Sequence, residues 1–172
     1  VNLSAYKPAD FLISRVAWSP DSRRVLFQAQ NREQTFLDLN AADLNGKVTK
    51  LFTETTPAWV EAIDNPEFLE DGSIVWLSER NGFRHLYHLD ASGRLVKQIT
   101  DGRWEVSSFH GVDETNGYVY FSAVGENGDW INTHVYRARL DGSRAPERLT
   151  KEAGTHRASF NPTFTHFIDS WS

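Results

Sequence analysis

The stretch that decides the fold is LDASGRLVKQIT, which spans residues 89–100. Related stretches lie on either side of it, LNGKVTKLFT at residues 44–53 and LDGSRAPERLT at residues 140–150, so the motif recurs about every 50 residues. Each copy begins with Leu and an Asx residue near a Gly, and each ends with Thr after an apolar residue. A repeat of this length that holds several short strands is typical of the blades of a β-propeller.

Short segments rich in apolar, β-branched and aromatic residues fill the chain between these copies, as in residues 24–28, 73–77 and 118–122. Asp-Gly and Asn-Gly pairs separate many of the segments, and such pairs favour the positive φ of tight hairpin turns. The sequence shows no convincing amphipathic helix. It therefore predicts an all-β chain, namely a β-propeller segment of about three and a half four-stranded antiparallel blades.

We place this partial β-propeller over residues 1–172. The blades are expected at about residues 11–53, 63–100 and 105–150, with a part-blade at residues 156–172. An ordinary β-sandwich also has strands at such spacing, but it does not predict one motif three times. Propellers close with about four to eight blades. We therefore expect either a piece of a longer propeller, which the strand-like last residues favour, or self-association of copies that complete one another.

Composition excludes several classes of function. The 172 residues carry a net charge of −5, whereas a nucleic-acid-binding domain normally shows a basic stripe, so no nucleic acid partner is expected. The chain has no Cys, which excludes disulfides, thiolate catalysis and Cys-based metal sites. Its six His residues show no spacing typical of metal ligands, because His85 and His88 would point to opposite faces of a strand. We expect no metal and no cofactor.

Four segments resemble a known family. They are RVAWSPDS at residues 15–22, SERNGFRHLY at residues 78–87, GRWEV at residues 102–106 and GTH at residues 154–156. In this order they resemble the N-terminal β-propeller in the dipeptidyl peptidase IV branch of the prolyl oligopeptidase family of serine peptidases. The resemblance extends from about Phe11 to the last residues, and the second and third segments are its most specific part.

The resemblance implies a parent protein that removes dipeptides from peptide N-termini, typically after Pro or Ala. In that family an α/β-hydrolase domain of the same chain carries a Ser-Asp-His triad, and the propeller gates and shapes the site. The resemblance also suggests a periplasmic, secreted or membrane-anchored location. The rival interpretation is a non-catalytic β-propeller that serves as a binding scaffold for a protein or a glycan.

Two functional motifs of that family are missing from these 172 residues. There is no Gly-x-Ser-x-Gly, the sharp turn that presents the nucleophilic serine in α/β-hydrolases. There is also no Glu-Glu pair, the motif that holds the free amino group of the substrate in the family. We therefore expect no catalytic residue in this chain, and we interpret it as the later part of the propeller.

The connection at residues 56–67 is the best candidate for a functional site. It joins the outer strand of one blade to the inner strand of the next, and by resemblance that face is turned toward the active site. Trp59 is expected to stack on a peptide substrate or a partner, and Glu61 and Asp64 to attract the ammonium group of a peptide. The alternative is that Trp59 packs between two blades and that the acidic residues are solvated.

The repeat also predicts a core. Trp76 occupies the position that Phe27 and Phe121 take in the neighbouring copies. Aromatic residues at equivalent positions of a repeat indicate a buried layer, because each repeat buries its face against a neighbour. We therefore expect Trp76 in the core and Trp59 on the surface.

Overall fold

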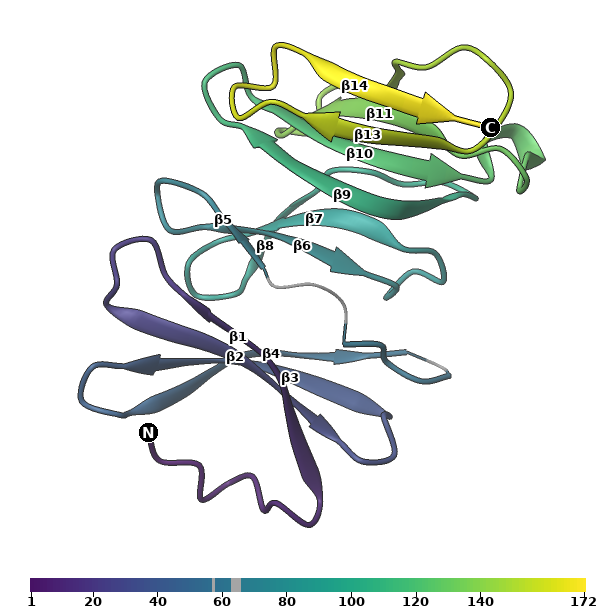
Figure 1. Cartoon of the computed structure of the whole chain (residues 1–172). Helices are drawn as coiled ribbons and strands as arrows, with labels where there is room; N and C mark the ends of the chain where they lie inside the picture. The colour runs from purple at the N-terminus through teal and green to yellow at the C-terminus, as the bar shows by residue number, and fades with distance from the viewer. Residues whose placement is uncertain (57, 63–65) are drawn as a thin grey trace. The chain divides into compact units, whose positions relative to one another are not determined.

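The computed structural model describes residues 1–56, 58–62 and 66–172 and shows an all-β chain. Its strands form four antiparallel sheets, three with four strands and one with two (Figure 1). Within the described residues the only helical element is one 3₁₀ turn, η1 (Glu126–Gly128). The predicted fold class of about three and a half four-stranded antiparallel units is confirmed.

Strands pair in chain order within each sheet, as expected where hairpins join neighbouring strands. The first sheet consists of β1 (Phe11–Trp18), β2 (Arg24–Asn31), β3 (Phe36–Asp43) and β4 (Val48–Thr55). The second consists of β5 (Glu67–Phe68), β6 (Ile74–Ser78), β7 (His85–Leu89) and β8 (Leu95–Gln98). The third consists of β9 (Glu105–Asp113), β10 (Tyr118–Val124), β11 (His134–Arg139) and β12 (Glu147–Arg148), and the last of β13 (His156–Phe160) and β14 (Phe167–Trp171).

The chain divides into two compact units. The first unit comprises Val1–Gly82 and Leu89–Val96. The second comprises Phe83–His88 and Lys97–Ser172.

Buried residues concentrate in the second and third strands of the four-stranded sheets, which have a hydrogen-bonded neighbour on both sides. The aromatic layer predicted from the repeat is confirmed, because Phe27, Trp76 and Phe121 are only 5%, 4% and 0% exposed. Trp59, in contrast, is 62% exposed, so it is the surface residue that the sequence predicts.

The closing Thr of the repeat has a structural task in the second and third copies. Thr100 Oγ1 accepts a hydrogen bond from the Leu86 backbone N–H at 3.0 Å and lies 3.2 Å from Nδ1 of His85. Thr150 Oγ1 lies 3.1 Å from Nδ1 of His134 in the same way. All four side chains are buried. These two contacts, here called the His–Thr pairs, join the start of the third strand to the end of the repeat.

Candidate functional site

The connection between β4 and β5 holds the residues that the sequence selects, and it is fixed to the first unit at Val60. The buried Val60 donates its backbone N–H to the Gln34 carbonyl at 2.7 Å, and its own carbonyl accepts from the side-chain amide of Gln30. Trp59 and Glu61 flank this anchor and are exposed. Trp59 and Glu61 therefore lie on a segment whose backbone is fixed by the hydrogen bonds of Val60.

The third candidate, Asp64, lies outside the described residues. In the structure Trp59 and Glu61 are both exposed, on the same short segment. The functional role of Trp59, Glu61 and Asp64 stays a prediction. Part of that segment is further ordered by Thr56, whose hydroxyl donates to the Trp59 carbonyl at 2.9 Å.

A buried carboxylate at the end of β4 lies close in sequence to this segment. Glu54 accepts hydrogen bonds from the Trp76 indole N–H at 3.0 Å, from the Ser78 hydroxyl at 2.8 Å and from the Arg80 guanidinium at 3.0 Å. The ion pair with Arg80 offsets the cost of burying the charge. Arg80 lies in the segment SERNGFRHLY that the sequence analysis quotes, but nothing in that segment predicts its buried partner. No sequence signal marked Glu54.

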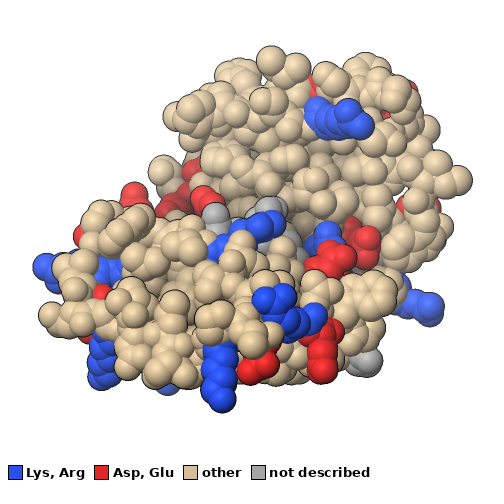
Figure 2. All heavy atoms as spheres, turned by 60° about the horizontal axis from the view of Figure 1, so that its bottom comes forward, with Lys and Arg blue, Asp and Glu red and all other residues tan. Residues whose placement is uncertain are grey.

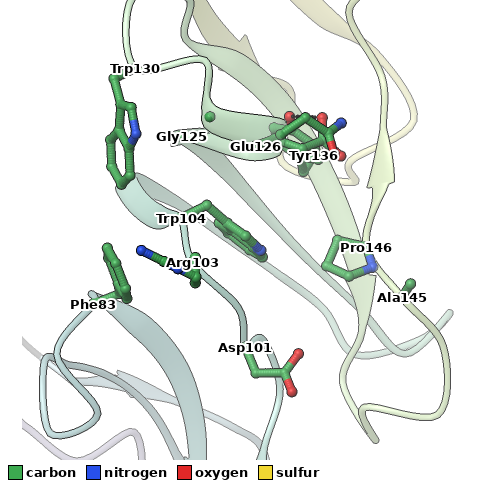
Figure 3. Close-up of a pocket in the computed structure, with 12 residues that line it drawn as sticks. Phe83, Asp101, Arg103, Trp104, Gly125, Glu126, Trp130, Tyr136, Ala145 and Pro146 are labelled. Atoms are coloured by element: carbon green, nitrogen blue, oxygen red, sulfur yellow. Dashed lines mark hydrogen bonds between the residues drawn. The ribbon is translucent and has the colours of Figure 1, made fainter.

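A cavity of about 620 Å³ opens in the second unit and was not predicted (Figure 3). Such a volume is within the range of small-ligand sites. The walls come from the loops that precede β7, β9, β11 and β12 and from Tyr136 on β11, and they combine aromatic and charged side chains. We call it the aromatic pocket, and its main lining residues are Phe83, Asp101, Arg103, Trp104, Glu126, Trp130, Tyr136 and Pro146.

Stacked rings form two parts of the aromatic pocket. Trp130 stacks on Phe83, with ring centroids 5.9 Å apart and planes 22° apart. Trp104 stacks on Phe121 at 5.9 Å and on Tyr136 at 6.3 Å. Offset stacking of this kind contributes beyond the burial of area and holds the rings in place.

Only some charged groups of the aromatic pocket are engaged. Glu126 accepts a hydrogen bond from the Tyr136 hydroxyl at 2.7 Å and lies 3.8 Å from Arg148. Burial and the neighbouring carboxylate raise the pKa of Tyr136, so its hydroxyl stays protonated and donates. Arg103 has neither a hydrogen bond nor an ion pair with any described residue, and the same holds for the Asp101 carboxylate.

A second cavity of similar volume, about 610 Å³, lies in the first unit beside Tyr6. Its polar groups are engaged with one another. The Tyr6 hydroxyl lies 2.9 Å from both Asp38 and Asn40, the Thr53 hydroxyl donates to Asp38 at 2.5 Å, and Lys50 lies 3.5 Å from Asp38. Burial and Asp38 raise the pKa of Tyr6 to about 12. These polar side chains of the second cavity therefore already have hydrogen-bond or ion-pair partners within the protein.

Charges of both signs are interspersed on the face shown in Figure 2, with uncharged residues between them. Among the described residues, no three His, Asp or Glu side chains are grouped so that they would hold a metal ion. The described part of the chain also includes no helix that is long and apolar enough to cross a membrane.

Comparison with protein families decides the relationship. The family model described as "Dipeptidyl peptidase IV (DPP IV) N-terminal region" matches residues 1–172, the whole chain. The chain belongs to this family. The predicted resemblance to the dipeptidyl peptidase IV branch is thereby confirmed.

Individual relatives of this DPP IV N-terminal region are distant in sequence. The protein named probable dipeptidyl peptidase 4 of Aspergillus flavus is 26% identical over 69% of this chain and 17% of its own length. The inactive dipeptidyl peptidase 10 of Rattus norvegicus is 24% identical over 95% of this chain and 22% of its own length. The chain thus spans about a fifth of the length of these curated relatives.

The crystal structure of Porphyromonas gingivalis dipeptidyl peptidase 4 has the same fold in this region. It superposes with a TM-score of 0.85 at 24% identity, covering 96% of this chain and 23% of the other. At this identity the similarity establishes the fold of the DPP IV N-terminal region, a β-propeller segment.

Proposed function

We propose that this chain is part of the regulatory propeller of a serine dipeptidyl peptidase, which removes N-terminal dipeptides of the Xaa-Pro or Xaa-Ala type through an acyl-enzyme. The observation that carries the proposal is the family match over all 172 residues, together with the absence of Gly-x-Ser-x-Gly from those residues. The chain itself contributes no catalytic triad.

The chemistry belongs to an α/β-hydrolase domain of the same parent chain, which is the proposed partner of this region. There a Ser attacks the scissile carbonyl, a His takes and returns its proton, and an Asp orients the His. The propeller contributes access control, because a closed ring of blades admits short or unstructured peptides and excludes folded ones.

The connection between β4 and β5, in which the sequence has Trp59, Glu61 and Asp64, is the proposed substrate-facing part of this chain. Its two acidic residues would raise the local concentration of peptides with a free ammonium group. The pinned backbone at Val60 supports this role, because an anchored segment loses less conformational freedom when it orders around a ligand.

A second candidate function is a binding scaffold without catalysis. It is favoured by one observation, namely that the inactive dipeptidyl peptidase 10 of the rat aligns with 95% of this chain. Similarity in this region alone therefore does not distinguish an active peptidase from an inactive relative. The sequence of the hydrolase domain is needed to distinguish them.

The test begins with the sequence downstream in the parent protein. The peptidase proposal expects a Gly-x-Ser-x-Gly elbow followed by Asp and then His. The full-length parent should then release chromophore from glycyl-prolyl p-nitroanilide, and both its elbow Ser→Ala variant and the 172-residue chain should not. A parent that lacks the elbow supports the scaffold. Turnover by the 172-residue chain that persists after a serine-directed inhibitor would overturn the proposal.

The substrate-facing segment has its own test in the full-length parent. Trp59→Ala and Glu61→Gln are expected to raise KM about three- to tenfold with little change in kcat, because they affect binding and not chemistry. The matched control is Glu33→Gln, an exposed acidic residue of the same unit. If both segment variants behave like the control, the segment has no part in substrate binding.

A further inference from the structure

The aromatic pocket of the second unit displays ring surface that the fold does not bury. Trp130 is 51% exposed although it stacks on Phe83. Trp104 forms another wall, held between the stacked Phe121 and Tyr136 and the edge of His85, whose ring centroid lies 5.0 Å away. Exposed and rigid aromatic side chains are the usual anchors of binding surfaces.

Two glycines make this arrangement possible. Gly125 has a φ of +92°, and a Cβ there would lie 2.7 Å from the Trp130 ring. Gly102 has a φ of +121°, and a Cβ there would lie 2.6 Å from the indole nitrogen of Trp104. At both positions a side chain would disfavour the positive φ and would also collide with the tryptophan ring that packs on the glycine. Each tryptophan is therefore held in place by close packing on its own loop.

The charged side chains of the aromatic pocket indicate the charge of a ligand that would bind there. Figure 3 shows the Arg103 side chain between Trp104 and the Phe83–Trp130 pair. Its guanidinium has no hydrogen bond or ion pair with any described residue, whereas Glu126 is engaged by Tyr136 and Arg148. A guanidinium without a partner matches a carboxylate, which it can bind through two parallel hydrogen bonds.

We propose that the aromatic pocket binds an extended peptide segment that presents a proline or aromatic ring beside a carboxylate. The ring would lie against Trp130 and Trp104, and the carboxylate would pair with Arg103, while Asp101 can accept from a peptide N–H. Aromatic-lined grooves bind extended proline-rich peptides well because such peptides are already ordered before binding. A neutral glycan fits less well, since it would leave the charge of Arg103 without a counter-charge.

Binding at the aromatic pocket does not depend on catalysis. The probe is therefore N-acetyl-pentaproline with a free carboxylate, compared with its C-terminal amide. An acetylated N-terminus offers no ammonium group to an exopeptidase, so binding is measured apart from the proposed function. Isothermal titration calorimetry on the full-length parent should show saturable binding of the acid, at least fivefold tighter than the amide.

Variants assign the binding to this pocket. Trp130→Ala should weaken binding of both peptides about tenfold or more, and Arg103→Gln should weaken the acid to the level of the amide. The matched controls are Ile131→Ala, which is 86% exposed beside Trp130, and Arg157→Gln, exposed on β13. Both controls should bind like the parent, and all variants should keep its thermal midpoint.

Three results would overturn the proposal. The first is no saturable binding of either peptide up to about 10 mM, where even a weak site would be filled. The second is binding that Trp130→Ala and Arg103→Gln leave unchanged. The third is saturable binding of a neutral oligosaccharide such as maltopentaose, lost in Trp130→Ala, without binding of the peptides, which would assign the pocket to glycans.

Discussion

Trp76 combines apolar packing with a polar contact to a buried charge. Its ring meets Phe52 edge-on at 5.3 Å, and its indole N–H donates to Glu54. Removing the side chain therefore leaves both a cavity and a carboxylate that has lost one of its donors. Trp59, only a few residues from Glu54 in the chain, has most of its surface in water.

The first prediction compares these two tryptophans in the full-length parent. Trp76→Ala should cost about 3–5 kcal/mol, as truncation of a buried aromatic side chain typically does. Trp59→Ala should cost about 0.5 kcal/mol or less, as at most exposed positions. Chemical denaturation monitored by circular dichroism measures both values.

Trp76→Phe separates the two roles of the side chain. It keeps much of the packing and removes the donor to Glu54, so it should cost about 1–3 kcal/mol. A Trp76→Ala variant as stable as the parent would show that the alignment of the repeats is wrong. Equal losses for Trp76→Ala and Trp59→Ala would make Trp59 a packing residue.

The loop between β10 and β11 contains two glycines with positive φ that differ in surroundings. Gly125 faces the Trp130 ring, whereas a Cβ on Gly128 would meet nothing within 4 Å. This pair separates the cost of the backbone conformation from the cost of displacing the tryptophan.

Gly128→Ala should lose about 1 kcal/mol of stability, because a side chain disfavours positive φ. Gly125→Ala should lose more than Gly128→Ala, because its Cβ must also displace the Trp130 ring. Only Gly125→Ala should also move Trp130 off Phe83. Tryptophan fluorescence and the affinity for N-acetyl-pentaproline should therefore change in Gly125→Ala and stay unchanged in Gly128→Ala. The same response in both variants would show that contact with Gly125 does not position Trp130.

Strands and sheets were largely predictable because the repeat carries them. Alternating apolar segments and Asx-Gly turns specify hairpins locally, and Gly72 and Gly117 indeed have positive φ. The motif also marked Thr100 and Thr150, although it did not reveal that each one contacts a buried His. That contact depends on a side chain from another strand, which no local pattern specifies.

The aromatic pocket was not predictable in the same way, because its residues come from separate loops. Trp104 belongs to a motif quoted for the family, and Trp130 follows two glycines, but neither position predicts that both line one cavity. The connection with Trp59 was selected because it joins the outer strand of one blade to the inner strand of the next, and the structure confirms only that Trp59 is exposed. Glu54 was missed because an acidic residue in a strand reads as solvent-facing until its partners are known.

Edge strands at the first and last sheets carry exposed apolar side chains. On β1, Val16 and Trp18 are 57% and 60% exposed, and on β14, Ile168 and Trp171 are 73% and 55% exposed. Such surface on an edge strand favours pairing with another chain.

The third prediction is that the 172-residue chain associates in solution. Sedimentation velocity at about 50 µM should show dimers or larger species, because apolar patches of this kind seldom stay in water. Val16→Lys on β1 should shift the distribution toward monomer. Leu44→Lys, at an exposed position between β3 and β4, is the control and should not. An unsubstituted 172-residue chain that sediments as a single monomer would refute the prediction.

Several histidines make the stability of the whole chain sensitive to mild acid. Burial lowers the pKa of His85 and His110, and burial together with the charge of Arg148 lowers the pKa of His134. In the unfolded chain these groups titrate near about 6.5. Below that pH the unfolded state binds more protons than the folded state, so stability falls as the pH decreases.

The thermal midpoint of the full-length parent should be constant above about pH 7 and should decrease from about pH 6.5 to pH 5, a window that lies above the titration of carboxyl groups. His134→Gln should reduce the slope, and His166→Gln, at an exposed position, should leave it unchanged. A flat midpoint across this window would show that the buried histidines do not oppose protonation.

The two His–Thr pairs have a consequence for how the chain reaches its native pairing. The pairs are chemically identical, so His85 would accept Thr150 as readily as Thr100 on contact chemistry alone. Chain connectivity distinguishes them, because Thr100 is 15 residues from His85 and Thr150 is about four times farther. Closing the longer loop costs about 1.2 kcal/mol more, which is roughly an eightfold preference for the nearer partner. The cost of loop closure therefore favours pairing within one copy of the repeat over exchange between copies, and a long insertion between β7 and β8 would reduce that preference.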